Sequence, residues 1–193
     1  MIVVLVLSAA LAVPPDYKVT KEDVEGCTLM LGPREADGVV PMRAECHWPD
    51  ITLEKFDGFF KEWGDHDLSF STVEASDVIG SEGGKLQVRQ VHVTKGISDR
   101  FIILDGERVE VEGGYRYQWT RSSHTETAPD GMVEAIRSDG YWEATAAEAG
   151  GVNVVHQLSY DPGGRVPGFL VRWFQTGGLA GIVTDLHAYL TTH

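Results

Sequence analysis

The sequence has 193 residues, of which 42% are hydrophobic and 23% charged, a balance typical of a folded globular protein rather than a fibrous or disordered one. A chain of this length buries roughly 70% of its unfolded surface, enough for one core, so residues 13–193 are expected to form a single domain. Sixteen Lys and Arg against 29 Asp and Glu give a formal net charge of −13. This charge opposes binding to polyanions, so nucleic acid is not an expected partner.

Residues 1–12, MIVVLVLSAALA, form an uncharged apolar segment that ends with the small residues Ala10 and Ala12. An apolar core followed by an Ala-x-Ala cleavage motif is typical of a signal peptide. Twelve residues are too few to cross a bilayer, which takes about 20 helical residues. We therefore predict an exported protein, periplasmic or extracellular. A buried first strand is the alternative, although Pro14 and Pro15 would end such a strand abruptly.

Two strands are predicted at residues 26–31 and 39–48, because the second alternates apolar and polar residues and a turn-like segment separates the two. Pairing them about this turn places Cys27 opposite Cys46. Directly opposed residues of an antiparallel pair have Cβ atoms about 4.5–5.5 Å apart, which a twisted ribbon can close to a disulfide. We predict this disulfide, which an exported chain is free to form. The alternative is two small buried hydrophobic side chains.

A short amphipathic helix is predicted after Pro49-Asp50, because aromatic residues recur at helical spacing from Phe56 to Trp63. Beyond Gly64 the pattern changes to period two, broken by glycine-containing turns such as Asp139-Gly140, which indicates a meander of antiparallel strands. The predicted strands span residues 68–79, 85–94, 100–104 continuing into 108–112, 115–121, 132–138, 141–146 and 152–160.

One apolar face of such a sheet requires cover, and the end of the chain supplies it. Apolar side chains repeat at helical spacing over residues 166–190, with the pair Gly177-Gly178 in the middle. If this pair kinks the helix without ending it, the helix is about 38 Å long and spans the whole domain.

Three stretches connect the sequence to a known family: Trp63, residues 96–104 (GISDRFIIL) and residues 159–172 (SYDPGGRVPGFLVR). With this order of elements the chain resembles the helix-grip fold and, more narrowly, the compact bacterial START lipid-transfer domains. The resemblance implies an α+β fold, a curved antiparallel β-sheet wrapped around a long C-terminal α-helix. The family's Arg-Asp dipeptide is reversed here as Asp99-Arg100, and residues 85–94 contain no Asp or Glu that could pair with Arg100.

The resemblance implies non-enzymatic binding or transfer of a lipid or other hydrophobic small molecule, with transient membrane contact, in a cavity beneath the C-terminal helix. The alternative is an aromatase/cyclase-type enzyme of the same fold, in which polar cavity residues direct proton transfer. A third alternative is an interaction protein whose own side chains fill the cavity, which a volume below about 300 Å³ would favour. The candidate ligand-binding residues, each of which is alternatively ordinary core, are Trp63, Gln90, His92, Arg100, Tyr117, Trp119, Trp142, Phe169 and Trp173.

Patterns typical of catalysis or metal binding are missing from the sequence. The histidines show no metal-site spacing, no G-x-S-x-G motif occurs, and two cysteines without nearby histidines do not complete a zinc site. His47, His66 and His193 are predicted to be solvated, His66 because an aspartate flanks it on each side. His92 and His156 lie within predicted strands. No catalytic residue, metal or cofactor is therefore predicted.

Overall fold

The computed structural model describes residues 14–123, 126–168, 171 and 174–193. The strands are β1 (Lys18–Val24), β2 (Cys27–Leu31), β3 (Met42–Trp48), β4 (Val73–Glu82), β5 (Lys85–His92), β6 (Arg100–Val111), β7 (Gly114–Arg121), β8 (Val133–Glu134), β9 (Arg137–Ala146) and β10 (Val152–Asp161). The helices are α1 (Leu53–Lys61), the 3₁₀-helix η1 (Trp63–Leu68), the π-helical turn η2 (Phe174–Gly178) and α3 (Leu179–Thr192). The predicted signal peptide, residues 1–12, lies outside the described residues.

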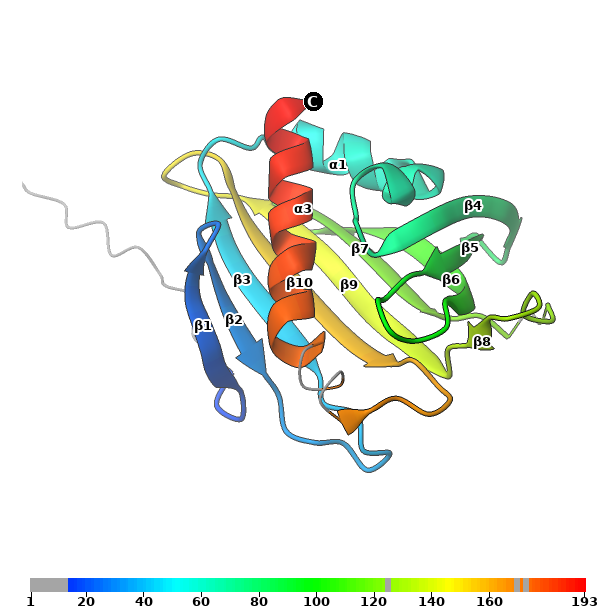
Figure 1. Cartoon of the computed structure of the whole chain (residues 1–193). Coiled ribbons are helices and arrows are strands. Elements are labelled where there is room, and N and C mark those ends of the chain that lie inside the picture. Colours follow the sequence, from blue (N-terminus) through cyan, green and yellow to red (C-terminus); the bar gives the residue numbers. More distant parts are fainter. Residues whose placement is uncertain (1–13, 124–125, 169–170, 172–173) are drawn as a thin grey trace, which may run out of the picture.

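All ten strands form one sheet, in the order β1-β2-β3-β10-β9-β7-β6-β5-β4, and β8 pairs with β6. Every pair is antiparallel except β6–β8, which is parallel. Helix α3 lies across one face of this curved sheet, and α1 lies beside it on the same face (Figure 1). The predicted α+β arrangement is confirmed.

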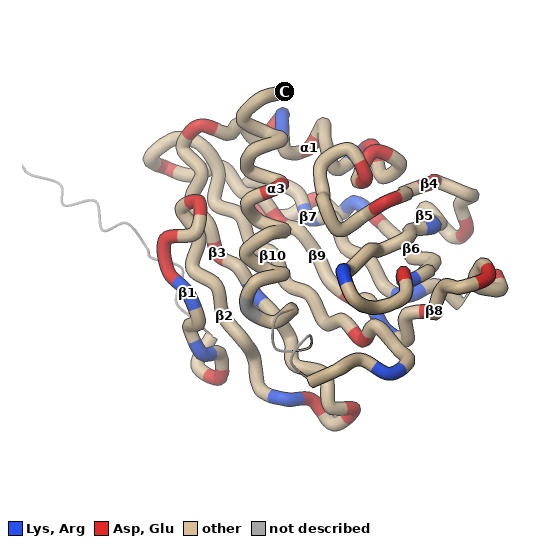
Figure 2. The backbone as a smooth tube through the Cα atoms, in the orientation of Figure 1, with Lys and Arg blue, Asp and Glu red and all other residues tan. Residues whose placement is uncertain are grey.

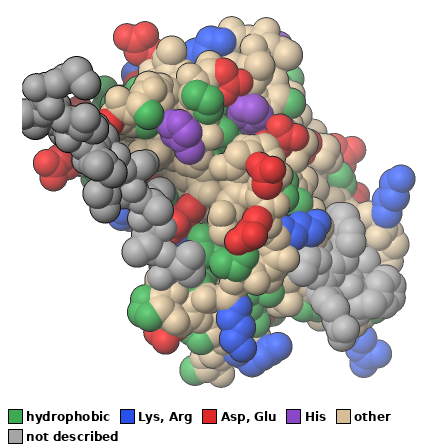
Figure 3. Space-filling model, turned by 90° about the vertical axis from the view of Figure 1, so that its left-hand side faces the viewer, with side chains coloured by type: hydrophobic (Ala, Val, Ile, Leu, Met, Phe, Trp, Pro, Cys, Tyr) green, Lys and Arg blue, Asp and Glu red, His purple; other side chains and the backbone are tan. Residues whose placement is uncertain are grey.

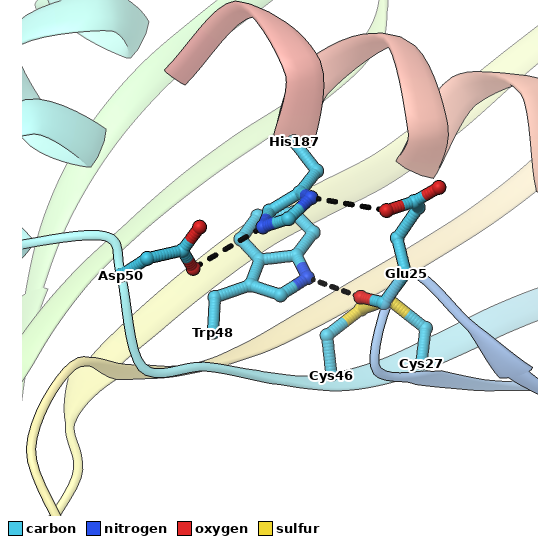
Figure 4. The surroundings of a disulfide bond; sticks show 6 residues. All are labelled: Glu25, Cys27, Cys46, Trp48, Asp50 and His187. Atoms are coloured by element: carbon cyan, nitrogen blue, oxygen red, sulfur yellow. Dashed lines mark hydrogen bonds and ion pairs between the residues drawn. A yellow bond between two sulfur atoms is a disulfide. The ribbon is translucent and has the colours of Figure 1, made fainter. Parts of the chain in front are cut away.

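The predicted disulfide is present between β2 and β3. The strand register places Cys27 directly opposite Cys46, and their sulfur atoms are bonded. Both cysteines are buried, and the indole Nε1 of Trp48, two residues further along β3, donates to the carbonyl oxygen of Glu25 at 2.7 Å (Figure 4). The cross-link therefore lies in the core and fixes the register of this edge of the sheet.

Strand β1 is not predicted by the sequence, because Lys18–Val24 has polar residues on both of its faces. All of its residues but the last are exposed. Charged side chains on an exposed edge strand discourage pairing with another chain. Figure 3, which views the molecule from this edge, shows acidic, basic and histidine side chains scattered among hydrophobic side chains.

The predicted turn at Asp139-Gly140 is wrong, because β9 continues through both residues. Gly140 lies opposite Trp119 of β7, and a Cβ atom at position 140 would lie 2.8 Å from Cζ2 of that indole. Gly106 likewise lies within the continuous strand β6, where a Cβ atom would lie 2.7 Å from Cη2 of Trp63. These two glycines allow tryptophan rings to pack directly on the sheet.

Helix α1 begins where Thr52 caps it, since the Thr52 Oγ1 accepts a hydrogen bond from the Lys55 backbone at 3.2 Å. Its buried Asp57 accepts hydrogen bonds at one oxygen from Arg108 Nε (2.7 Å) and the Tyr117 hydroxyl (2.5 Å). Burial alone would raise the pKa of Asp57, but the hydrogen bonds from Arg108, Lys61 and Tyr117 outweigh it and lower the pKa to about 2. The charged carboxylate holds α1 against β6 and β7.

The C-terminal helix packs on the sheet through one apolar stripe and carries little charge. Leu179, Val183, Leu186 and Leu190 are buried, and Asp185 is the only acidic or basic residue in α3 apart from histidine (Figure 2). The glycine pair predicted to kink the helix lies in η2, which leads directly into α3, so the helix widens there without ending. Residues 169–170 and 172–173 of the predicted helix lie outside the described residues.

The C-terminal half of α3 is attached to the disulfide region by His187. Its imidazole lies between the carboxylates of Glu25 (Nδ1 to Oε2, 3.3 Å) and Asp50 (Nε2 to Oδ1, 3.2 Å), and its ring centre lies 5.0 Å from that of Trp48 (Figure 4). These contacts join the helix to the β1–β2 turn and to the segment after β3.

Replacing both Cys27 and Cys46 by serine is expected to lower the free energy of unfolding by about 3 kcal/mol, because the bridge restricts the unfolded chain over a loop of 19 residues. Guanidinium denaturation of the oxidised protein and the double variant measures this difference. A reducing agent should lower the stability of the wild type to that of the variant and leave the variant unchanged. Equal stability of the oxidised protein and the variant would contradict the prediction.

Candidate functional site

A cavity lies under the first turns of the C-terminal helix, between η2 and the sheet. Its walls come from β3, η1, β4, β5, β6, β7, β9, β10, η2 and the start of α3. Its volume is about 130 Å³, below the roughly 300 Å³ at which ligand pockets usually begin and close to the ~150 Å³ of a cavity that holds one benzene molecule. Without movement of the chain, this space takes a small ring and not a whole lipid.

Tryptophans form much of the cavity wall. Trp63, Trp119 and Trp142 all line it, as does Phe70. The rings of Trp63 and Trp119 meet edge to face with centres 6.5 Å apart, and Phe70 stacks against Trp142 with centres 6.4 Å apart. Such an aromatic surface binds apolar groups, and flat rings in particular, by dispersion and burial.

A chain of polar side chains runs along one side of the cavity. The Tyr160 hydroxyl lies 3.2 Å from His92 Nδ1, and His92 Nε2 lies 3.1 Å from the Oε1 of Gln90. The Nε2 of Gln90 in turn contacts His66 Nδ1 (3.4 Å) and Ser76 Oγ (3.0 Å). Four of these five residues line the cavity, and only Ser76 lies behind it. The cavity is therefore apolar with one ordered polar side.

The histidines of the cavity are uncharged at neutral pH. Burial lowers the pKa of His66 to about 4, and it lowers that of His156 to about 4 against the opposing effect of a hydrogen bond to the Tyr141 backbone. Burial also lowers the pKa of His92. Burial disfavours the charged form of Tyr160 as well, and for this acidic hydroxyl it therefore raises the pKa. The polar side of the cavity therefore presents neutral groups to a ligand.

Arg100 is the cationic side chain of the cavity wall, and it is only 4% exposed. Its guanidinium donates to the backbone carbonyl oxygens of Pro162 (2.9 Å), Gly163 (3.4 Å) and Ser98. Among the described residues no acid lies within ion-pair distance of Arg100, in line with the lack of Asp and Glu over residues 85–94. Arg100 thus fastens the loop after β10 to the start of β6.

The structure brings most of the predicted ligand-binding residues to this cavity. Trp63, Gln90, His92, Arg100, Trp119 and Trp142 line it. Tyr117 is fully buried elsewhere, with its hydroxyl on Asp57 of α1. The predicted residues Phe169 and Trp173 lie outside the described residues.

Sequence reasoning missed several residues of the cavity wall. His66 was expected to be solvated, and this is wrong: η1 turns its ring inward, where it is 6% exposed and stacks on Phe59. His156 and Tyr160 lie two strand periods apart on one face of β10 and both face the cavity. The alternation of β10 could have identified these two, whereas no local signal identifies His66.

Three histidines line the cavity, but they are not grouped as metal ligands. No group of three or more His, Cys, Asp or Glu within the described ranges could hold a metal ion. Separately, none of the helices formed by the described residues combines the length and apolar character needed to cross a membrane.

Comparison with known protein structures identifies the fold family that this geometry belongs to. No protein-family model matches the sequence, and a search of curated proteins finds no match. The backbone is similar to the STAR-related lipid transfer protein from Xanthomonas axonopodis, with a TM-score of 0.79 and 16% identity over 91% of this chain and 98% of that chain. The human StAR-related lipid transfer protein 5 gives a TM-score of 0.77 and 19% identity, with 92% and 86% covered. The chain has the START-type helix-grip fold.

The same START-type fold occurs in an enzyme. The Zhui aromatase/cyclase from Streptomyces sp. R1128 gives a TM-score of 0.53 at 12% identity, over 78% of this chain and 93% of that chain. Similarity at this level of identity shows the fold and leaves the function to the residues of the cavity.

The buried histidines predict a loss of stability in weak acid. Unfolded histidine binds a proton below about pH 6.5, whereas His66 and His156 stay neutral in the folded protein down to about pH 4. Between these values the unfolded state binds more protons, so the free energy of unfolding falls as the pH falls, by about 1.4 kcal/mol per pH unit for each histidine. Urea denaturation between about pH 7 and pH 5 measures this slope.

His92 contributes in the same way, because burial lowers its pKa to about 4 as well. The variant His66→Gln should therefore remove about one third of this slope, and His47→Gln, at an exposed position, should leave it unchanged. Stability that stays constant from about pH 7 to pH 5 would show that these imidazoles accept protons in the folded state.

Proposed function

We propose that this protein binds a hydrophobic small molecule or lipid in the cavity beneath the first turns of the C-terminal helix and carries it, chemically unchanged, outside the cytoplasm. The observation that carries this proposal is the hollow lined by Trp63, Trp119 and Trp142 in a fold shared with proteins named for lipid transfer. The core disulfide and the apolar segment at residues 1–12 support export. Transfer then requires transient contact with a membrane or with another carrier.

The volume of the cavity indicates how binding would proceed. A single ring buries about 200 Å², worth about 5 kcal/mol before association losses, which corresponds to an affinity no better than about millimolar. A ligand that buries about 400 Å² gains roughly 10 kcal/mol and reaches micromolar affinity. Such a ligand requires more space, and movement of η2 would provide it, because η2 lines the cavity directly before α3.

Two features favour binding over an aromatase/cyclase-type reaction. None of the described residues of the cavity wall is Asp, Glu, Lys or Cys. Proton transfer would therefore fall on histidines with a pKa near 4 and on Tyr160, whose pKa is raised. Groups titrating that far from neutrality are weak acid–base catalysts at pH 7.

The small volume favours a second candidate function, an interaction protein whose own side chains fill the cavity. The two candidates differ in whether the purified protein carries a guest.

Native mass spectrometry of protein purified from its host, followed by organic extraction, tests the proposal. A bound organic molecule is expected on the wild type. It should be absent from Ile182→Trp, because Ile182 lines the cavity and a larger ring there fills it, and present on the control Val78→Trp, at an exposed position of β4. Empty wild-type protein that also fails to take up a pyrene-labelled fatty acid would support the filled scaffold instead.

We expect the π-helical turn η2 to control the rate of ligand exchange. Replacing Gly177 and Gly178 by alanine favours the helix by about 1 kcal/mol per residue, so opening of this turn and exchange should slow by about tenfold or more. A Cβ at position 178 would lie 3.3 Å from Phe174 Cδ1, which a small shift of that ring accommodates. Transfer of a pyrene-labelled fatty acid to phosphatidylcholine vesicles, followed by stopped-flow fluorescence, measures the rate.

Gly181→Ala is the matched control, because Gly181 lies in α3 beyond the π-helical turn and a Cβ there meets nothing within 4 Å. An equal slowing by this control would show that the helix as a whole, and not the turn, limits exchange.

A further inference from the structure

Two buried nitrogen atoms of the cavity wall have no hydrogen-bond partner. They are Nε2 of His66 and Nε2 of His156, and among the described side chains no other buried nitrogen or oxygen is left in this way. A buried polar atom without a partner costs about 1–3 kcal/mol, and native proteins contain few of them. Both belong to histidines that line one cavity, so a ligand that moves the surrounding rings would find two unused hydrogen-bonding atoms behind them.

The hydrogen-bond chain determines which of these nitrogens is a donor. The Ser76 hydroxyl donates to the Trp63 carbonyl oxygen at 2.7 Å, so toward Gln90 it accepts, and the side of Gln90 that faces it is the amide nitrogen. The same amide nitrogen faces His66 Nδ1 at 3.4 Å. Because an amide nitrogen only donates, Nδ1 of His66 accepts, and the neutral ring carries its hydrogen on Nε2. His66 therefore offers an unused donor.

His156 has the opposite tautomer. Its Nδ1 lies 3.1 Å from the backbone carbonyl oxygen of Tyr141, which only accepts a hydrogen bond. The hydrogen of the neutral ring is therefore on Nδ1, and Nε2 keeps a free lone pair. His156 offers an unused acceptor.

Aromatic rings hold both histidines in place around the cavity. The His66 ring centre lies 5.3 Å from that of Trp63, and His156 stacks on Trp142 at 3.9 Å. Phe70 lies between these two groups, with its ring centre 5.8 Å from His66 and 6.4 Å from Trp142. Both nitrogens are fully buried, so the polar atom of a ligand reaches them when these rings shift to admit it.

We propose, building on the proposed function, that the cavity selects an apolar ring that carries a hydroxyl group, with His66 donating a hydrogen bond to the ligand and His156 accepting one from it. A hydroxyl both donates and accepts, and it is neutral like the two imidazoles. The volume of about 130 Å³ fits one such ring. A carboxylate only accepts hydrogen bonds, so it has no hydrogen to donate to Nε2 of His156. Arg100 is the cation of the cavity wall, and three of its five N–H groups already donate to carbonyl oxygens.

Calorimetric titration with phenol, toluene and benzoate at about pH 7 tests this selectivity. Phenol and toluene have nearly the same shape and differ in a hydroxyl against a methyl group. Two hydrogen bonds at about 0.5–1.5 kcal/mol each predict that phenol binds about tenfold more tightly than toluene, and that benzoate binds most weakly.

Single variants then assign the effect to the two histidines. His66→Phe and His156→Phe should each lower the affinity for phenol about threefold and leave that for toluene unchanged, so that the ratio of the two falls from about ten to about three. His47→Phe, at an exposed position, should keep the ratio of the wild type. A merely structural role would lower both affinities together. His66→Phe decides the matter alone if loss of the bond to Tyr141 unfolds the His156 variant.

Each outcome separates this inference from the proposed function. Toluene binding as tightly as phenol, or benzoate binding best, overturns the hydroxyl selectivity and leaves a hydrophobic binding protein. A phenol preference that is undiminished in both variants overturns the role of His66 and His156. If none of the three probes binds and no guest co-purifies, the proposed function fails together with the inference.

Discussion

The two short helices α1 and α3, with the 3₁₀-helix η1, have to cover the apolar face of a ten-stranded sheet, and this mismatch in area determines the rest of the structure. Helix α3 contacts β1, β2 and β3, whereas α1 contacts β7 and β9. Tight packing through Val183 and Leu190 ends where the helix widens at η2. The space left there, between the helix and the tryptophans on the far strands, is the cavity. It follows from the architecture, and only the side chains around it decide what it holds.

The polar groups inside this protein form two kinds of hydrogen-bond network, one charged and one neutral. Asp57 is charged and is held by Arg108, Tyr117 and Lys61, which removes it from any role in the cavity. On the cavity wall, by contrast, the side chains of Tyr160, His92 and Gln90 are neutral and are joined in one chain that continues through Ser76 to the Trp63 backbone. The charged network fixes a helix on the sheet, and the neutral one borders the cavity.

The features predicted correctly from the sequence are those that depend on local alternation. The pairing of Cys27 with Cys46 and most strands of the meander follow from period-two patterns. The errors depend on partners distant in sequence: Gly140 was taken for a turn, but it makes room for Trp119. His66 has an aspartate on each side in sequence, yet the 3₁₀ geometry of η1 directs its ring to the core. Strand alternation could identify wall residues on the strands, such as Trp119 and Trp142, but not those that loops, η1 and η2 contribute.

The polar contacts of the final helix lie toward its C-terminal end, where His187 pairs with Glu25 and Asp50 next to the disulfide and Asp185 accepts from Ser71, whereas Leu179 at its start is held by apolar packing. A rod fixed at one end moves most at the other. Leu179 lies eight residues, about 12 Å, before His187, and a tilt of about 20° about this anchor would lift the first turn by about 4 Å. A small rotation, without unfolding, would thus convert a space for one ring into an entrance for a larger guest, and the anchor would return the helix to the same place afterwards.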